Sequence, residues 1–120
     1  VNFANCDMVG HTGKYEASIK AVEAVDQCVG KLMKRCEQLG IPLALTADHG
    51  NCDQMVYEDG SPHTSHTNSP VPFVIFHPEL KGQKLEINGS GRALMDVGPT
   101  MLSIMDIDFP ETFEGKSIFQ

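Results

Sequence analysis

The sequence predicts an α/β fold in which mostly parallel strands are flanked by helices. A long stretch with helical periodicity, 15–39, lies between two short apolar stretches, 1–4 and 41–45. Another apolar stretch, 71–76, follows after a polar loop. A strand, a helix and a strand in succession are typical of a βαβ unit, whose two strands are parallel. We therefore expect a parallel sheet as the frame of this chain.

The helix predicted over 15–39 has one apolar face, because hydrophobic residues recur at every third or fourth position. Gly40 is placed to end the helix as a left-handed cap, and Pro42 prevents its continuation. The residues of the apolar face are Ile19, Val22, Val25, Cys28, Val29, Leu32, Met33, Cys36 and Leu39.

Polar, glycine-containing stretches separate the predicted strands. Residues 5–13 form a loop that contains two glycines, and residues 46–51 follow the apolar stretch at 41–45. A short strand at 54–57 leads through a turn into a third polar loop at 63–70. We expect ligand-binding side chains in such loops, since open α/β sheets bind ligands at the carboxyl ends of their strands.

The last part of the chain is rich in turns. A short strand is expected at 85–87, and Asp96 is expected to cap a helix over 97–105. Pro99 suits the first turn of that helix, where its missing N–H group costs nothing. The tail after the helix, 106–120, is expected to be mostly irregular.

Composition and charge exclude several classes of protein. The chain has 120 residues with a hydrophobic fraction of 41%, enough for one small domain with its own core. A net charge of -7 argues against a nucleic-acid-binding surface. No apolar run approaches the ~20 residues of a membrane span, and no signal peptide is recognisable at the start. We expect a cytoplasmic protein, and the start inside a predicted strand, without Met, indicates a fragment of a longer one.

The four cysteines are expected to be free thiols in a reducing compartment, because none of them forms a C-x-x-C pair. Cys28 and Cys36 belong to the predicted helix and would fill the core. Cys6 and Cys52 each lie close to a candidate ligand. The simpler interpretation makes these two chance neighbours of the site, and the alternative makes them sensitive to oxidation.

Carboxylates and imidazoles gather on the three loops. If the preceding strands are neighbours, these loops meet at one end of the sheet. Such a set suits Mn or Zn better than Ca, because imidazole is present. Two-metal sites hold their ions about 4 Å apart and clamp both oxygens of a displacement at phosphorus. The candidate ligands are Asp7 and His11, Asp48 and His49, and His66, with His63 as a rival to His66.

Each loop also has an ordinary structural interpretation. Asp7 could simply orient His11, and His66 could cap a turn. His63 is expected to be a solvated loop residue, and His77 is given no role. The combination of three such loops is more specific than any one of them.

Several motifs together resemble the C-terminal part of cofactor-independent phosphoglycerate mutase, a member of the alkaline phosphatase superfamily. The resemblance covers essentially the whole chain in order. Cys6 stands where that family often has proline. The matching stretches are NCDMVGHTG (5–13), KAVEAVD (20–26), TADHGN (46–51), HTSHTNSPVPF (63–73), MDVGPTML (95–102) and EGKS (114–117).

The resemblance implies a fold and a set of ligands. Residues 1–120 would be the C-terminal part of a metal-binding phosphatase-type domain with an alkaline phosphatase-like, three-layer fold. Two divalent metals would be bound, Mn in the first place, with Zn, Co or Mg as alternatives. The implied ligands are Asp7, His11 and His66 for the first metal and Asp48 and His49 for the second.

The resemblance also implies a reaction. The parent enzyme interconverts 2-phosphoglycerate and 3-phosphoglycerate in glycolysis and gluconeogenesis, through a phosphoserine on an upstream segment. No serine of this chain matches that nucleophile, so the chain would supply metal ligands and no catalytic residue. We expect the isolated chain to bind one metal weakly or none, because the second ion would lack ligands, and to be inactive alone. The parent would be a monomer, whereas an exposed sheet edge would favour self-association of the fragment.

Two other interpretations remain open from the sequence. The chain could belong to another member of the same superfamily, such as phosphopentomutase. It could also be a stand-alone metal-binding or interaction module without catalytic function.

Overall fold

The computed structural model describes residues 1–77, 79 and 91–119. The chain forms two compact units, Val1–Glu79 and Leu80–Gln120. The strand expected at 85–87 lies outside the described residues. Within the described part of the chain, no helix is both long and apolar enough to cross a membrane.

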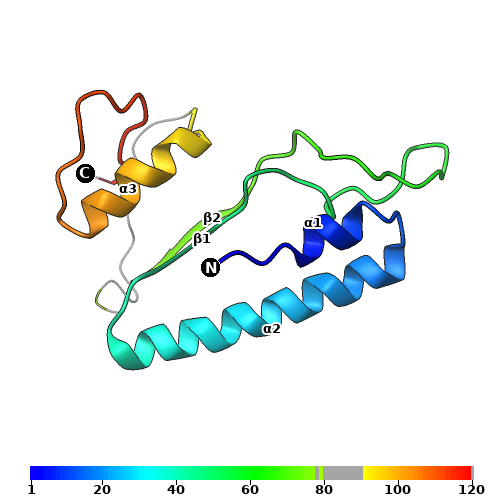
Figure 1. Ribbon diagram of the computed structural model, residues 1–120, viewed down its shortest axis with the longest axis horizontal. Coiled ribbons are helices and arrows are strands. Elements are labelled where there is room, and N and C mark those ends of the chain that lie inside the picture. The colour runs from blue at the N-terminus through cyan, green and yellow to red at the C-terminus, as the bar shows by residue number, and fades with distance from the viewer. Residues whose placement is uncertain (78, 80–90, 120) are drawn as a thin grey trace. The chain divides into compact units, whose positions relative to one another are not determined.

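The first unit consists of two helices and a two-stranded sheet (Figure 1). The elements are α1 (Asn5–Gly10), α2 (Tyr15–Leu39), β1 (Leu43–Thr46) and β2 (Phe73–Phe76). The short helix α1 packs beside the first turns of α2.

Helix α2 has the bounds that the apolar periodicity predicts. Gly40 ends it with a φ of 68°, in the left-handed region that a residue without Cβ adopts at least cost. The N–H group of Ile41 donates to the carbonyl of Cys36 over 2.9 Å, which is typical of a glycine-capped helix end. The predicted helix and its cap are confirmed.

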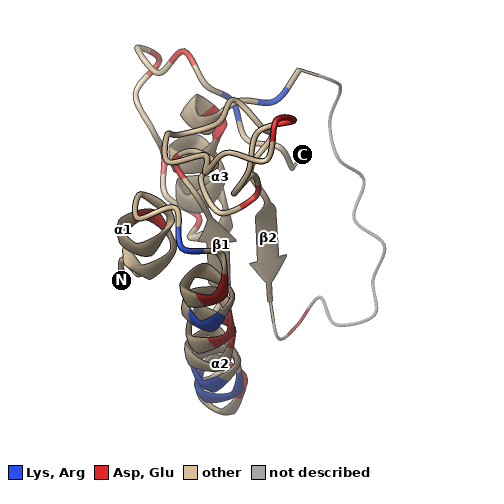
Figure 2. Ribbon diagram, turned by 90° about the vertical axis from the view of Figure 1, so that its right-hand side faces the viewer, with Lys and Arg blue, Asp and Glu red and all other residues tan. Residues whose placement is uncertain are grey.

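The apolar face of α2 is only partly covered. Ser18 and Ala21 are its buried residues, and the residues Val25 and Leu32 are half-buried. Val22 remains 47% exposed. Figure 2 shows basic and acidic positions along the rest of α2 and none on the two strands. The helix is therefore amphipathic, as predicted, but Cys28 and Cys36 are half-buried instead of filling a core.

The sheet differs from the expected parallel pair. Strands β1 and β2 are antiparallel, with Leu43 opposite Phe76 and Thr46 opposite Phe73. Their connection, 47–72, contains no helix that could carry the chain back to the same end, so the second strand returns in the opposite direction. Of the expected βαβ unit, helix α2 and strand β1 are present and residues 1–4 form no strand, so the larger parallel sheet stays a prediction.

The structure also corrects the strand that the sequence predicted at residues 1–4. Residues 1–4 do not form a strand, because no described strand lies beside them to complete a hydrogen-bonded ladder. The loop expected at 5–13 begins instead with the six residues of α1. Asp7 in the first turn of α1 interacts favourably with the positive end of that helix.

The third correction concerns 54–57. A single antiparallel bridge joins Val56 to Pro62 instead of a strand, and the N–H group of Tyr57 donates to the carbonyl of Ser61.

His63 is not solvated as expected. It is 7% exposed, and the centroid of its ring lies 4.6 Å from that of Tyr57. The tight turn at 57–61 folds the segment back on itself and buries the imidazole.

The second unit contains the short 3-10 helix η2 (Leu94–Asp96) and helix α3 (Val97–Ile104). Asp96 occupies the N-cap position of α3, but its carboxylate does not cap that helix. It accepts hydrogen bonds from the N–H groups of Ala93 (3.0 Å) and Lys116 (2.8 Å). The predicted helix is confirmed, with Pro99 buried in its first turn, and the role expected for Asp96 is corrected.

Candidate metal centre

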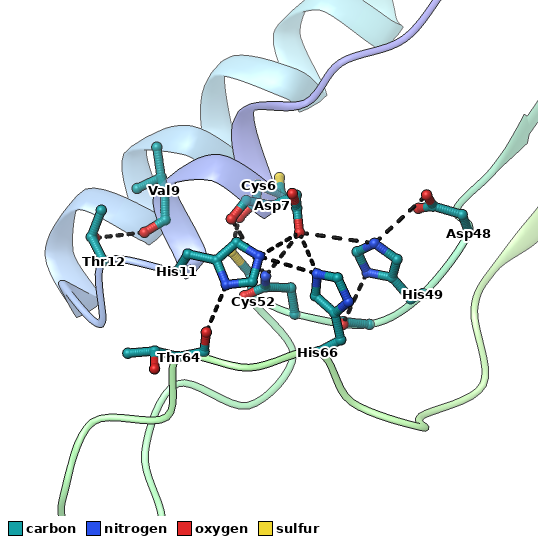
Figure 3. A network of polar contacts seen from close by, with 12 residues as sticks. Cys6, Asp7, Val9, His11, Thr12, Asp48, His49, Cys52, Thr64 and His66 are labelled. Atoms are coloured by element: carbon teal, nitrogen blue, oxygen red, sulfur yellow. Dashed lines mark hydrogen bonds and ion pairs between the residues drawn. The ribbon is translucent and has the colours of Figure 1, made fainter.

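Three histidine side chains converge on one carboxylate oxygen. The Nε2 atoms of His66, His11 and His49 lie 3.0, 3.2 and 3.9 Å from Oδ1 of Asp7. Figure 3 shows these side chains reaching the same point from α1 and from the two loops that follow β1. Residues 59 positions apart in the chain thus meet at a single atom.

Helix α1 positions the first pair. Asp7 lies inside this helix and His11 directly follows it, so the two side chains are four residues apart and project from the same face. The N–H group of His11 donates to the carbonyl of Asp7 over 3.1 Å and continues the helical hydrogen bonding. This local geometry alone keeps the carboxylate and the imidazole together.

The second and third loops are tied to each other. The N–H group of Thr67 donates to the carbonyl of Gly50 over 2.9 Å, and its hydroxyl donates to Asp53 over 2.8 Å. A Cβ atom on Gly50 would lie 2.1 Å from the hydroxyl oxygen of Thr67, so this approach requires glycine. The bridge places His49 beside His66, and their rings stack with centroids 3.6 Å apart.

The other ring nitrogen of two histidines faces a backbone carbonyl. Nδ1 of His11 lies 2.6 Å from the carbonyl oxygen of Thr64, and Nδ1 of His49 lies 3.3 Å from that of Gly50. A carbonyl can only accept, so we assign the proton of each ring to Nδ1. Nε2 of both rings then carries a free lone pair directed toward Asp7, as in metal-binding histidines.

The spacing of these atoms fits a metal ion. Oδ1 of Asp7 and the Nε2 atoms of His11 and His66 form a triangle with sides of 3.2, 3.0 and 3.1 Å. Ligands at about 2.0–2.1 Å from a tetrahedral ion would lie about 3.3 Å apart. Lone pairs that face one another at this distance repel unless a cation or a proton lies between them. The donor set therefore fits a divalent metal.

The structure brings together four of the five predicted ligands. Asp7, His49 and His66 also form a group whose ligand atoms all lie within 4.8 Å of one another. The exception is Asp48, whose side chain is 83% exposed and whose nearest site contact is Nε2 of His49 at 3.6 Å. His63 does not reach the cluster, because it is buried against Tyr57.

Sequence reasoning missed the role of Asn51. This residue is 6% exposed, and its amide donates to Oδ1 of Asp7 over 3.1 Å. In the sequence, the only indication of this role was the position of Asn51, two residues after His49 in a loop rich in candidate ligands. Partial burial raises the pKa of Asp7, but the hydrogen bond from Asn51 and the neighbouring His11 and His66 outweigh burial and keep this pKa below its usual value.

A second missed feature lies next to this carboxylate. The thiol of Cys52 donates to the carbonyl oxygen of Cys6 over 3.0 Å, so the residues that flank Asn51 and Asp7 are also in contact. Burial, and then the neighbouring Cys52 thiol, raise the pKa of Cys6. Both cysteines are half-buried.

Comparison with known proteins places this chain in a family. Residues 1–109 match the family described as the metalloenzyme superfamily. The 2,3-bisphosphoglycerate-independent phosphoglycerate mutase of Myxococcus xanthus is 54% identical over 108 residues, which are 89% of this chain and 20% of that protein. The enzyme of the same name from Syntrophotalea carbinolica is 48% identical over 120 residues, which are 100% of this chain and 23% of that protein.

A solved structure agrees with the sequence matches. The crystal structure of Leishmania mexicana phosphoglycerate mutase at low cobalt concentration superimposes with a TM-score of 0.84 at 35% identity. The match covers 98% of this chain and 24% of that one, so the chain spans about a quarter of the relative's length. This similarity supports an alkaline phosphatase-like α/β fold. The chain thus belongs to the metalloenzyme superfamily, in which it is similar to one segment of the 2,3-bisphosphoglycerate-independent phosphoglycerate mutases.

Proposed function

We propose that this chain is the metal-ligating segment of an enzyme that interconverts 2-phosphoglycerate and 3-phosphoglycerate. The observation that carries the proposal is the convergence of three imidazole nitrogens on Oδ1 of Asp7. The names of the similar proteins favour the mutase over phosphopentomutase. On this proposal, residues 1–120 are the C-terminal part of a phosphatase-type domain with a larger, mostly parallel three-layer sheet.

The proposal assigns Asp7, His11 and His66 to one metal and Asp48 and His49 to a second. Imidazole and carboxylate together favour Mn, with Zn, Co or Mg as alternatives. When bound, such a pair of ions clamps the oxygens of a phosphoryl group during its transfer. The position of His49, 3.9 Å from Asp7 and 3.6 Å from Asp48, suits a residue at the boundary between the two ions.

The residues of this chain bind and orient; we do not assign a nucleophile among them. In the described part of the chain, no serine hydroxyl contacts Asp7 or the three imidazoles. A metal-activated nucleophile must therefore come from another segment. We accordingly expect the isolated 120-residue chain to bind at most one metal, weakly, and to lack mutase activity.

Calorimetric titration with Mn and with Zn tests the ligand assignment. We expect saturable binding by the chain and at least about tenfold weaker binding after His66→Ala or His11→Ala. His77→Ala is the matched control, because His77 is a half-buried histidine of the same unit whose ring accepts from the N–H group of Glu79. Equal affinities of the parent and of His66→Ala would refute the assignment.

Mutase activity is tested on the longer polypeptide that contains this segment. Conversion of 3-phosphoglycerate to 2-phosphoglycerate should require divalent metal and should be lost in His66→Ala but retained in His77→Ala. Activity on phosphopentoses without activity on phosphoglycerate would identify the other branch of the superfamily. Metal binding without activity on either substrate would favour a stand-alone metal-binding module.

The predicted self-association remains to be measured. Each of the two described strands has one edge without a strand partner, and Val74 of β2 is 52% exposed. Such an edge can pair with a second copy. Sedimentation velocity over a concentration series should show a rising sedimentation coefficient for the isolated chain, and a constant monomer value would contradict the expectation.

A further inference from the structure

Two cysteines bracket the contact between α1 and the loop after β1. Cys6 precedes Asp7, and Cys52 follows Asn51, so the pair flanks the hydrogen bond that joins those two residues. The cysteines are 46 positions apart in the chain, yet the thiol of Cys52 donates to the carbonyl oxygen of Cys6 over 3.0 Å (Figure 3). The fold, and not the sequence spacing, brings them together.

The geometry is compatible with a covalent bond. A carbonyl oxygen lies about 2.4 Å from the Cα atom of its own residue, so Sγ of Cys52 is within about 5.4 Å of the Cα atom of Cys6. A disulfide needs Cα atoms about 4.4–6.8 Å apart, and a sulfur this close to the Cα atom of Cys6 is compatible with that requirement.

Neither Cys6 nor Cys52 is fully buried: each is half-buried. Thiol–disulfide exchange requires thiols that a reagent can reach, and fully buried thiols are inert. The two remaining cysteines do not form such a pair. Cys28 and Cys36 lie eight residues apart on α2, and the helical rise separates them by about 12 Å, beyond the reach of a disulfide.

We infer that Cys6 and Cys52 form a dithiol site that reacts with low-molecular-weight disulfides, such as glutathione disulfide, and closes to an intramolecular disulfide. The site is separate from the metal ligands and does not depend on the proposed function. Its closure links α1 covalently to the loop after β1, beside the hydrogen bond between Asn51 and Asp7.

The reaction is a pair of thiol–disulfide exchanges. One cysteine, as thiolate, attacks a sulfur of glutathione disulfide, forms a mixed disulfide and releases one glutathione thiolate. The second cysteine, as thiolate, attacks the protein sulfur of that mixed disulfide and releases the second glutathione thiolate. The protein loses two electrons and two protons, glutathione disulfide is reduced, and the two released thiolates take up the protons.

The test uses the whole 120-residue chain with Cys36→Ser, so that each cysteine falls on a separate tryptic peptide. These peptides are 1–14 with Cys6, 21–31 with Cys28 and 36–81 with Cys52. The chain is equilibrated in glutathione buffers of increasing oxidised fraction, the thiols are trapped by alkylation, and the peptides are identified by mass spectrometry. We expect peptides 1–14 and 36–81 to be joined by a disulfide, with Cys28 left as a thiol or as its glutathione adduct.

A parallel equilibration in concentrated urea distinguishes a folded site from chance encounter. In an unfolded chain, two thiols 46 positions apart meet at an effective concentration on the order of millimolar. We expect the equilibrium constant for the disulfide to be at least about tenfold larger in the folded chain than in urea, since the fold holds Cys52 against Cys6. Equal constants, or no linked peptide without urea, would overturn the inference.

Further variants serve as controls. Cys6→Ser and Cys52→Ser, each in the Cys36→Ser background, should abolish the linked peptide and leave only glutathione adducts. Cys28→Ser in that background should leave the equilibrium constant unchanged. A linked peptide that contains Cys28 in amounts comparable to the expected one would also overturn the inference.

Discussion

The amide group of Asn51 donates a hydrogen bond to Oδ1 of Asp7 over 3.1 Å, across 44 positions of the chain. The same oxygen is the point on which His11, His49 and His66 converge. A buried amide thus fixes the carboxylate that organises the cluster. Outer hydrogen bonds of this kind keep metal ligands in position before the ion binds.

The first prediction concerns this hydrogen bond. Asn51→Ala should weaken binding of Mn or Zn by about tenfold, because Asp7 loses the donor that orients it. Titration calorimetry measures the affinity. Asn2→Ala is the control, since Asn2 is exposed and outside the cluster. An unchanged affinity in Asn51→Ala would show that the three imidazoles alone orient the carboxylate.

The second prediction concerns the close packing of Gly10 against the side chain of Asn51. A Cβ atom on Gly10 would lie 2.0 Å from Oδ1 of Asn51 and 3.2 Å from Sγ of Cys52. Gly10→Ala should therefore displace the amide, lower the metal affinity and reduce the free energy of unfolding by about 1–3 kcal/mol. Urea denaturation and calorimetry measure the two effects.

Gly30 provides the matched control for that substitution. A Cβ atom there would meet nothing within 4 Å, and Gly30 is an exposed interior residue of α2. Gly30→Ala should raise the free energy of unfolding by about 0.5–1 kcal/mol, because alanine favours the helix, and should leave metal binding unchanged. If Gly10→Ala and Gly30→Ala changed the free energy of unfolding in the same direction, the steric argument for Gly10 would be wrong.

The third prediction concerns the buried hydroxyl of Thr100 in the second unit. It donates to the carbonyl of Asp96 over 2.5 Å and accepts from the N–H group of Ile118 over 3.1 Å. Thr100→Val keeps the shape but leaves both backbone groups without this partner, so the free energy of unfolding should fall by about 1–3 kcal/mol. Thr112→Val, at an exposed position of the same unit, should change it little.

Hydrogen–deuterium exchange gives a local measurement of the same substitution. The amide of Ile118 should exchange faster in Thr100→Val, because its hydrogen-bond acceptor is gone. If the exchange of this amide and the free energy of unfolding were both unchanged, the hydroxyl would not link α3 to the tail.

The fourth prediction is a pH dependence. The hydrogen bond from the N–H group of Lys116, and then that from Ala93, lower the pKa of Asp96 in the folded chain. A lowered pKa stabilises the folded state at every pH above the pKa of the unfolded chain, and the stabilisation is lost as the pH falls through the folded value. Asp96→Asn should therefore have a lower free energy of unfolding than the parent chain at neutral pH. On acidification, its free energy of unfolding should fall by less than that of the parent.

Urea denaturation at several pH values between 7 and the acid range measures both effects. Asp108→Asn is the control, because Asp108 is an exposed residue of the same unit whose carboxylate accepts no backbone hydrogen bond from the residues that the structure describes. Parallel stability curves for the parent and Asp96→Asn would contradict the assignment of this carboxylate as a source of acid sensitivity.

Local sequence patterns were sufficient where the decisive interactions are local. The apolar spacing and Gly40 predicted α2 with its bounds, since helical hydrogen bonds and a glycine cap connect residues only a few positions apart. The four-residue spacing of Asp7 and His11 likewise placed a carboxylate and an imidazole on one face. Asp7, His11, His49 and His66 lie together in the structure, as the sequence indicated, whereas Asp48 is exposed, and their role as ligands stays a prediction.

Contacts between distant segments were decided by the tertiary structure. The direction of β2 depends on the course of a long connection without a helix, and the sequence pattern of a strand is the same for parallel and antiparallel neighbours. The burial of His63 depends on a turn that folds it against Tyr57. That turn keeps His63 apart from the cluster that His66 joins.

The sequence by itself determined the chemical groups of the site, the long helix and the family resemblance, because these are written in residue types and short spacings. Only the tertiary structure decided that Asn51 holds Asp7 and that Cys52 touches Cys6. Those contacts join residues more than forty positions apart, and their energy depends on a chain path that no local pattern records.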